Sequence, residues 1–79
     1  MPHLLVKNRD KIVFEGEVDN ISSYNKIGLF DVLLDHSNFI SIVEKQIIII
    51  QNGARKEIPV DNGLLKVKGN NIFVYLGVK

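Results

Sequence analysis

The chain has 79 residues, of which 46% are hydrophobic and 24% charged, a composition typical of one small folded domain. Ten Lys and Arg against nine Asp and Glu leave a formal charge of +1, without the basic excess that nucleic-acid binding requires. Cysteine is absent, which excludes disulfides and thiolate metal ligands. We therefore expect a single soluble domain over residues 1–79, with no nucleic-acid partner and no direct membrane insertion.

Short apolar segments alternate with turn signals along the whole chain. Ile and Val supply 20 residues and Ala only one, a bias that favours strands over helices. The Asn-Gly pairs at Asn52 and Asn62 predict tight hairpin turns. Strands are predicted near 3–8, 11–15, 17–23, 28–33, 39–43, 45–51, 54–60, 63–68 and 71–77. The fold class is therefore all-β, a small β-sandwich or flattened barrel of about eight to ten short, mostly antiparallel strands.

Four consecutive isoleucines follow Gln46. Successive side chains of a strand point to opposite faces, so these four cannot all face one core. Either a neighbouring loop or strand covers the outer face of this strand, or the run forms an exposed apolar patch that docks a partner. Pro59 cannot donate a ladder hydrogen bond, so its strand is predicted to be an edge or to carry a bulge there.

The chain has few groups that could carry chemistry. His3 and His36 are the only histidines, and neither has a carboxylate at metal-ligand spacing. Asp31 and Asp35 would be aimed differently by a strand and its turn, which argues against an acid–base pair. His36 follows Asp35 in a predicted turn, where it either hydrogen-bonds the local backbone or makes a specific contact. We predict no metal, no cofactor and no catalytic residue, so the protein is not expected to be an enzyme.

The aromatic residues give little support to base stacking. The four phenylalanines lie in apolar strand contexts and are predicted to belong to the core; they are Phe14, Phe30, Phe39 and Phe73. Only Tyr24 and Tyr75 are expected to reach solvent. An oligonucleotide-binding barrel, which needs aromatic side chains on a basic face, is therefore disfavoured.

Three segments stand in the order and spacing of a known family. The family's most specific motif is PGxxGxxGVLPxH, and the sequence YNKIGLFDVLLDH matches it at Gly28, Val32, Leu33 and His36, with apolar Ile40 following. The opening LLVKNRDKIVFEGEVDNIS and the end DNGLLKVKGNNIFVYL are similar to the family's entry strand and to its closing GGFLEVKGNKVTVL. Over nearly its whole length the chain resembles the amino-terminal β-sandwich domain of the epsilon subunit of F-type ATP synthases, called delta in mitochondria.

The chain departs from this pattern in the loop before His36. Asn25 stands where the family usually has glycine, an exchange that we expect to be tolerated because Asn adopts positive φ more readily than most residues. Asp31 replaces a second glycine and Leu34 the usual proline, which predicts a less rigid or differently shaped loop. Leu29 occupies a position where the family commonly carries glutamate.

The resemblance implies a non-catalytic rotor subunit in the central stalk of a proton- or sodium-translocating synthase. It would couple the gamma subunit to the c-ring, on the cytoplasmic side of the bacterial plasma membrane or in the mitochondrial or plastid equivalent. The candidate c-ring contacts are Gly28, Leu29, Asp31, Asp35 and His36, and the candidate gamma-facing patch is Ile47, Ile48, Ile49 and Ile50. Family members usually continue into a helical hairpin tied to inhibition and, in some bacteria, ATP binding. This chain stops at Lys79, so we expect that hairpin to be absent.

A second interpretation needs no synthase. The chain would then be a free-standing β-sandwich that binds other proteins and forms a homo-oligomer in isolation through an edge strand. Sharing a fold does not by itself fix function.

Overall fold

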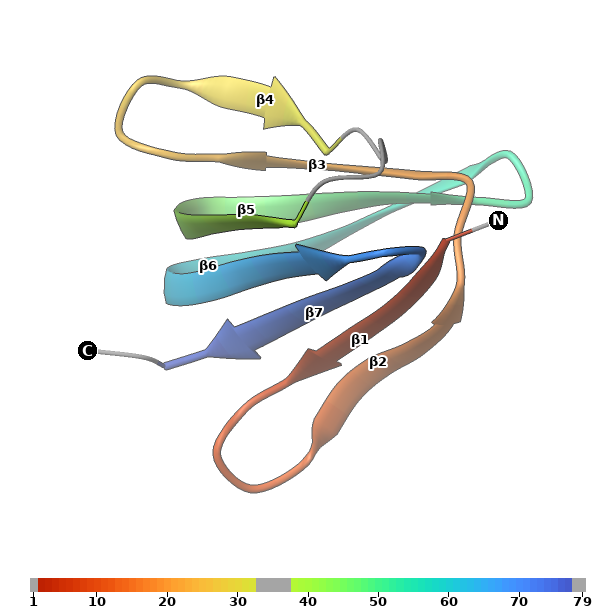
Figure 1. The fold of residues 1–79 in the computed structure, drawn as a ribbon, viewed down its shortest axis with the longest axis horizontal. Coiled ribbons are helices and arrows are strands. Elements are labelled where there is room, and N and C mark those ends of the chain that lie inside the picture. Colours follow the sequence, from red (N-terminus) through yellow and green to blue (C-terminus); the bar gives the residue numbers. More distant parts are fainter. Residues whose placement is uncertain (1, 33–37, 78–79) are drawn as a thin grey trace.

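The structure is a computed structural model that describes residues 2–32 and 38–77, and strands make up its elements (Figure 1). The strands are β1 (His3–Lys7), β2 (Ile12–Glu17), β3 (Asn20–Tyr24), β4 (Leu29–Asp31), β5 (Phe39–Gln51), β6 (Ala54–Lys68) and β7 (Asn71–Leu76). They form one sheet in the order β2-β1-β7-β6-β5-β3-β4. Neighbours are antiparallel except β1 and β7, which run parallel. The all-β prediction is confirmed.

The long strands β5 and β6 each serve both halves of the sandwich. The first part of β5 and the last part of β6 continue into β7, β1 and β2. The other parts of the same two strands continue into β3 and β4. Four of the nine predicted strands, namely 39–43, 45–51, 54–60 and 63–68, therefore merge into two. The predicted strand count was too high because the breaks between them are bulges and not turns.

The two Asn-Gly pairs behave differently. Asn52 and Gly53 both have positive φ, 52° and 78°, and they join β5 to β6 as the hairpin turn that was predicted. The prediction of a second turn at Asn62 is wrong, because β6 continues through this position with a bulge. There Gly63 allows close packing: a Cβ on it would lie 3.1 Å from methyl groups of Val43 and Val60.

Aliphatic side chains from both halves form one core. Its members with the lowest exposure include Leu4, Val6, Ile21, Ile47, Ile49, Leu65, Ile72 and Val74. Ile47 and Ile49 point into this core, and Ile48, on the opposite face of β5, is also buried. The isoleucine run is therefore a strand covered on both faces, the first of the two alternatives. The exposed-patch alternative is wrong for these three residues, and Ile50 is half-buried.

An aromatic side chain lies where the two halves meet at each open side of the sandwich. On one side the rings of Phe30 in β4 and Phe39 in β5 pack edge to face, with centroids 6.2 Å apart. On the other side the Lys56 ammonium lies 5.4 Å from the ring centroid of Phe14. Phe39 keeps 43% of its surface exposed, so the prediction of a core position is wrong for it.

Pro59 occupies an edge, as predicted. It pairs with Gln46 of β5, and residues 54–60 of β6 have no strand on their other side among the described residues. The missing N–H of Pro59 therefore costs no ladder hydrogen bond.

A helix that could span a bilayer does not occur within the described part of the chain.

Candidate functional site

The turn between β3 and β4 is built around the side chain of Asn25. Its Oδ1 accepts hydrogen bonds from the backbone N–H groups of Ile27 (2.8 Å) and Gly28 (3.1 Å). The backbone N–H of Asn25 donates to the Gly28 carbonyl at 3.0 Å. Asn25 does not have positive φ, so the reason expected for the tolerance of Asn here is wrong. The side-chain oxygen closes the turn instead, as in an Asx turn. Gly28 adopts φ +146°, which only glycine reaches readily.

The apolar residues of this turn point outward. Ile27 is 96% exposed and Leu29 is 59% exposed, the first beside polar Lys26 and the second at the start of β4. Burying one such side chain at an interface would contribute roughly 1.5–3 kcal/mol. Ile27 was not among the candidate contacts. Its signal in the sequence is an isoleucine placed inside a polar turn sequence, between Lys26 and Gly28.

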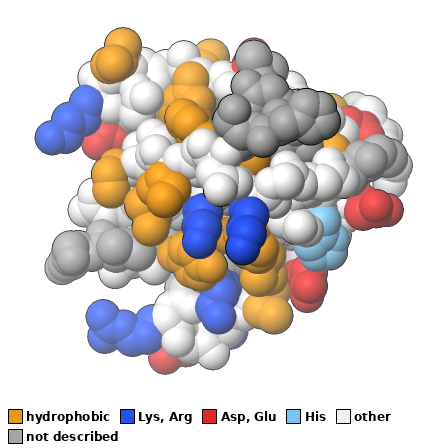
Figure 2. All heavy atoms as spheres, viewed as in Figure 1, with side chains coloured by type: hydrophobic (Ala, Val, Ile, Leu, Met, Phe, Trp, Pro, Cys, Tyr) orange, Lys and Arg blue, Asp and Glu red, His pale blue; other side chains and the backbone are white. Residues whose placement is uncertain are grey.

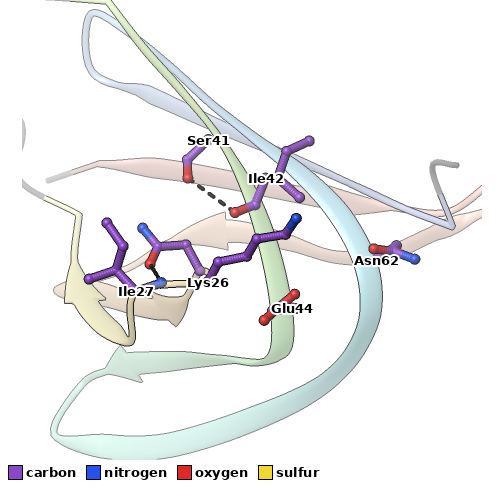
Figure 3. Close-up of a pocket in the computed structure, with 7 residues that line it drawn as sticks. Lys26, Ile27, Ser41, Ile42, Glu44 and Asn62 are labelled. Carbon is purple, nitrogen blue, oxygen red and sulfur yellow. Dashed lines mark hydrogen bonds between the residues drawn. The ribbon is translucent and has the colours of Figure 1, made fainter.

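A pocket of about 530 Å³ lies between this turn and the bulged region of β5 and β6 (Figure 3). Its lining residues are Asn25, Lys26, Ile27, Ser41, Ile42, Glu44 and Asn62. Lys26 and Glu44 bring opposite charges to its walls, and Ile27 and Ile42 bring exposed apolar surface. Such a mixed surface suits contact with another polypeptide.

Asp31 contacts the neighbouring strand, and its relation to Asp35 lies outside the described residues. Its carboxylate accepts a hydrogen bond from the Ser22 hydroxyl, which joins β4 to β3 across the sheet. The remaining candidate contacts of this loop, Asp35 and His36, lie outside the described residues, as does Leu34. The structure thus brings Gly28, Leu29 and Asp31 together on one short hairpin.

Behind this hairpin, a bulge in β5 is held by a buried serine. Ser23 of β3 has no exposed surface, and its hydroxyl donates to the Gln46 carbonyl at 3.0 Å. The bulge places Lys45 at φ 71°, and its ammonium lies 5.3 Å from the Tyr24 ring centroid. The position of Tyr24, where the β3–β4 turn begins, is therefore tied to the bulge.

Ionisable groups do not gather into a metal-binding arrangement in the part of the chain that the structure describes. Two contacts between oppositely ionisable groups lie at the described surface. Arg55 pairs with Glu57 at 2.8 Å, and His3 lies 3.5 Å from Glu15, which is an ion pair only when the imidazole is protonated. Exposed pairs of this kind contribute little to stability. The other surface features described above are exposed apolar side chains, which are typical of surfaces that bind other proteins.

The open edge of β6 is poorly suited to self-association. Arg55 and Glu57 pair with each other on its exposed side, and Pro59 interrupts its donors. Charged side chains and proline are devices that oppose the addition of another strand. This edge therefore does not favour a homo-oligomer formed by strand pairing.

The fold agrees with a sequence comparison across the chain. Residues 3–76 match the family model of the ATP synthase delta/epsilon chain, β-sandwich domain. The chain belongs to this family. The match extends from the start of β1 to the end of β7, so every strand of this delta/epsilon sandwich lies inside it.

Curated relatives are epsilon chains of bacterial ATP synthases. That of Leptospira borgpetersenii serovar Hardjo-bovis (strain JB197) is 29% identical over 66 residues, covering 82% of this chain and 52% of its own length. That of Clostridium perfringens (strain SM101 / Type A) is 27% identical over 71 residues, covering 87% and 53%. The chain thus spans about half the length of these relatives.

A solved structure has the same fold. A chain in the mitochondrial ATP synthase of Euglena gracilis, in an assembly that includes the c-ring, superposes with a TM-score of 0.81 at 16% sequence identity. The superposition covers 92% of this chain and 48% of that one.

Proposed function

We propose that the chain is a non-catalytic central-stalk subunit of a proton- or sodium-translocating F-type ATP synthase, coupling the gamma subunit to the c-ring. The observation that carries this proposal is the match to the delta/epsilon family over residues 3–76, which takes in all seven strands. In a bacterium the chain would work on the cytoplasmic side of the plasma membrane, and in mitochondria or plastids on the equivalent side.

The loop end of the sandwich is the proposed contact with the c-ring. Exposed Leu29 and the neighbouring Gly28 and Asp31 form the described part of this contact, which would continue through Asp35 and His36. Ile27 extends it with the most exposed large apolar side chain among the described residues. The Asn25 hydrogen bonds support this role, because they hold the tip in one conformation.

A stiff body suits a part that transmits torque. The core consists of aliphatic side chains with almost no exposed surface, and such cores resist deformation. The strands β5 and β6 run through both halves and connect them without a flexible linker. Ile47, Ile48 and Ile49 are buried, so the gamma contact that we propose uses other side chains than these isoleucines.

The proposal is tested in the source organism with an affinity-tagged copy of the chain. Solubilised membranes are expected to yield gamma and c subunits with the tagged chain, in the ratio that they have in the intact synthase. Membrane vesicles carrying Ile27→Asp and Leu29→Asp should show weakened coupling between ATP hydrolysis and ion pumping. Ile12→Asp on β2 is the matched control for Leu29→Asp, because the two side chains are similarly exposed, at 55% and 59%. Recovery of the chain without any synthase subunit would refute the proposal.

A further inference from the structure

The two Asn-Gly pairs of the chain lie in different backbone environments. Asn52-Gly53 forms the turn of the β5–β6 hairpin, whereas Asn62-Gly63 lies inside β6. Both asparagine side chains are exposed. Asparagine is a chemically labile residue, most of all before glycine, which has no side chain to hinder attack by its nitrogen. A difference in reactivity between the two pairs would therefore come from the backbone around them.

Deamidation of an Asn-Gly pair follows a defined sequence of bonds. The glycine nitrogen loses its proton and forms a bond to the asparagine Cγ, and the side-chain nitrogen leaves as ammonia. The cyclic imide then takes up water. Opening at the side-chain carbonyl gives aspartate, and opening at the backbone carbonyl gives isoaspartate, in which the chain runs through Cβ and Cγ. Closing the ring requires the peptide group between the two residues to rotate.

The peptide group between Asn52 and Gly53 lies at the tip of the hairpin, beyond Gln51 and Ala54, which form the last pair of the ladder. A Cβ on Gly53 would meet no described atom within 4 Å. Figure 1 shows this tip at the end of the molecule away from the C-terminus, and Figure 2 shows hydrophobic side chains mainly over the middle of the same view. Opening such a tip costs far less free energy than unfolding the domain.

The peptide group between Asn62 and Gly63 is held from both sides. The Asn62 carbonyl accepts a hydrogen bond from the Gly77 N–H at 2.9 Å. Gly63 pairs with Val43 of β5 and with Leu76 of β7, and it is buried. Rotation of this peptide group would break the bond to Gly77 and separate β6 from its neighbours. Ring closure here therefore requires the middle of the sheet to open.

We propose that Asn52 is a site of spontaneous deamidation in the folded domain, and that strand pairing protects Asn62 from the same reaction. The inference does not depend on the proposed function. Isoaspartate adds an atom to the backbone of a two-residue turn, so the pairing of Gln51 with Ala54 changes. The Gln51 side chain connects this turn to the end of β2, since its Nε2 donates to the Glu17 carbonyl at 2.7 Å.

The test follows both sites in the purified chain during incubation in warm, mildly alkaline buffer, with and without unfolding concentrations of guanidinium chloride. Trypsin separates the two sites because Arg55 and Lys56 lie between them. Mass spectrometry of the peptides gives the rate at each site, and the ratio of unfolded to folded rate gives its protection. Protection is expected to be at least about tenfold greater at Asn62 than at Asn52. Labelling by an isoaspartyl methyltransferase should appear in the peptide that contains Asn52.

The variant Asn52→Gln is the matched control, because the longer side chain forms the corresponding ring far more slowly. It should release ammonia from the folded domain more slowly than the original chain. Equal protection at the two sites, or greater protection at Asn52, would overturn the inference. Ammonia release that is unchanged in the variant would also overturn it, because the reaction would then occur elsewhere. Circular dichroism during the incubation confirms that the sandwich stays folded.

Discussion

The Ser23 hydroxyl donates a hydrogen bond of 3.0 Å to the backbone carbonyl of Gln46. Ser23 is the buried polar residue of the described core, and Gln46 lies in the bulge where β5 departs from regular pairing with β3. The bond satisfies the serine in an apolar interior, and it ties β3 to the irregular part of β5. It therefore helps to hold β3 against the bulge of β5.

Replacing Ser23 by Ala should therefore lower the free energy of unfolding by about 1–3 kcal/mol, because the Gln46 carbonyl loses a bond that water cannot readily replace. Urea denaturation monitored by circular dichroism measures this. Ser22→Ala is the matched control, since Ser22 bonds to Asp31 at the surface and its loss should cost no more than about 0.5 kcal/mol. Equal losses in the two variants would contradict the role assigned to Ser23.

Gly63 should not tolerate even a methyl group. Its Cβ would come within 3.1 Å of Val43 and Val60 side-chain carbons and 3.2 Å of the Tyr75 carbonyl oxygen, which belongs to the backbone and cannot easily move. Gly63→Ala is expected to destabilise the domain by about 1–3 kcal/mol in thermal or urea unfolding. Gly16→Ala, where the nearest atom is 3.5 Å away on the flexible Gln51 side chain, should be neutral or slightly stabilising. A neutral Gly63→Ala would mean that this close packing is relieved without cost.

At position 45, glycine should be more stable than alanine, which is the reverse of the usual order in a strand. The φ of Lys45, 71°, is strained for any residue with a Cβ. Lys45→Gly and Lys45→Ala both lose the contact with Tyr24, but only the glycine variant relieves the strain. We expect the glycine variant to be the more stable of the two by about 1 kcal/mol.

The control for the two Lys45 variants is the same pair of substitutions at Lys66, which lies in a regular part of β6. There alanine should be more stable than glycine by about 0.5–1 kcal/mol, as in an ordinary strand. The same order at both positions in urea unfolding would argue against strain at Lys45.

The β3–β4 turn should depend on the oxygen of Asn25. Asn25→Ala removes the acceptor for the Ile27 and Gly28 N–H groups and should cost about 1 kcal/mol. Amide hydrogen exchange should become faster at these two residues. Asn25→Asp keeps an acceptor oxygen and should retain most of the protection. If exchange is unchanged in the alanine variant, the turn is held by its backbone bond alone.

Local features of the sequence predicted several elements correctly because they act over a few residues. The positive φ of Asn52 and Gly53 follows from the turn itself, and Pro59 marks an edge wherever the strand lies. The β-branched composition determined the fold class, and the motif around Gly28 indicated the family to which the chain belongs.

Tertiary packing decided what these local rules could not. The pair Asn62-Gly63 has the sequence of a turn, but it lies within β6. Glycine fits there because Val43 and Val60 leave little room for a Cβ. Three isoleucines of the 47–50 run are buried in the part of β5 that lies between β3 and β6. Phe73 lies on the outer side of β7 because its neighbours on both sides fill the core, so the core position predicted for it is wrong.

By itself, then, the sequence determined the class of fold, the family and the position of the loop that carries Gly28 and Leu29, since each depends on residues close together in the chain. Only the tertiary structure decided which apolar side chains remain exposed, because the side of a sheet that faces a core depends on pairing between distant strands. That pairing placed Lys66 beside Ile40 and Phe73, and it buried the isoleucines that the sequence had offered as a docking patch.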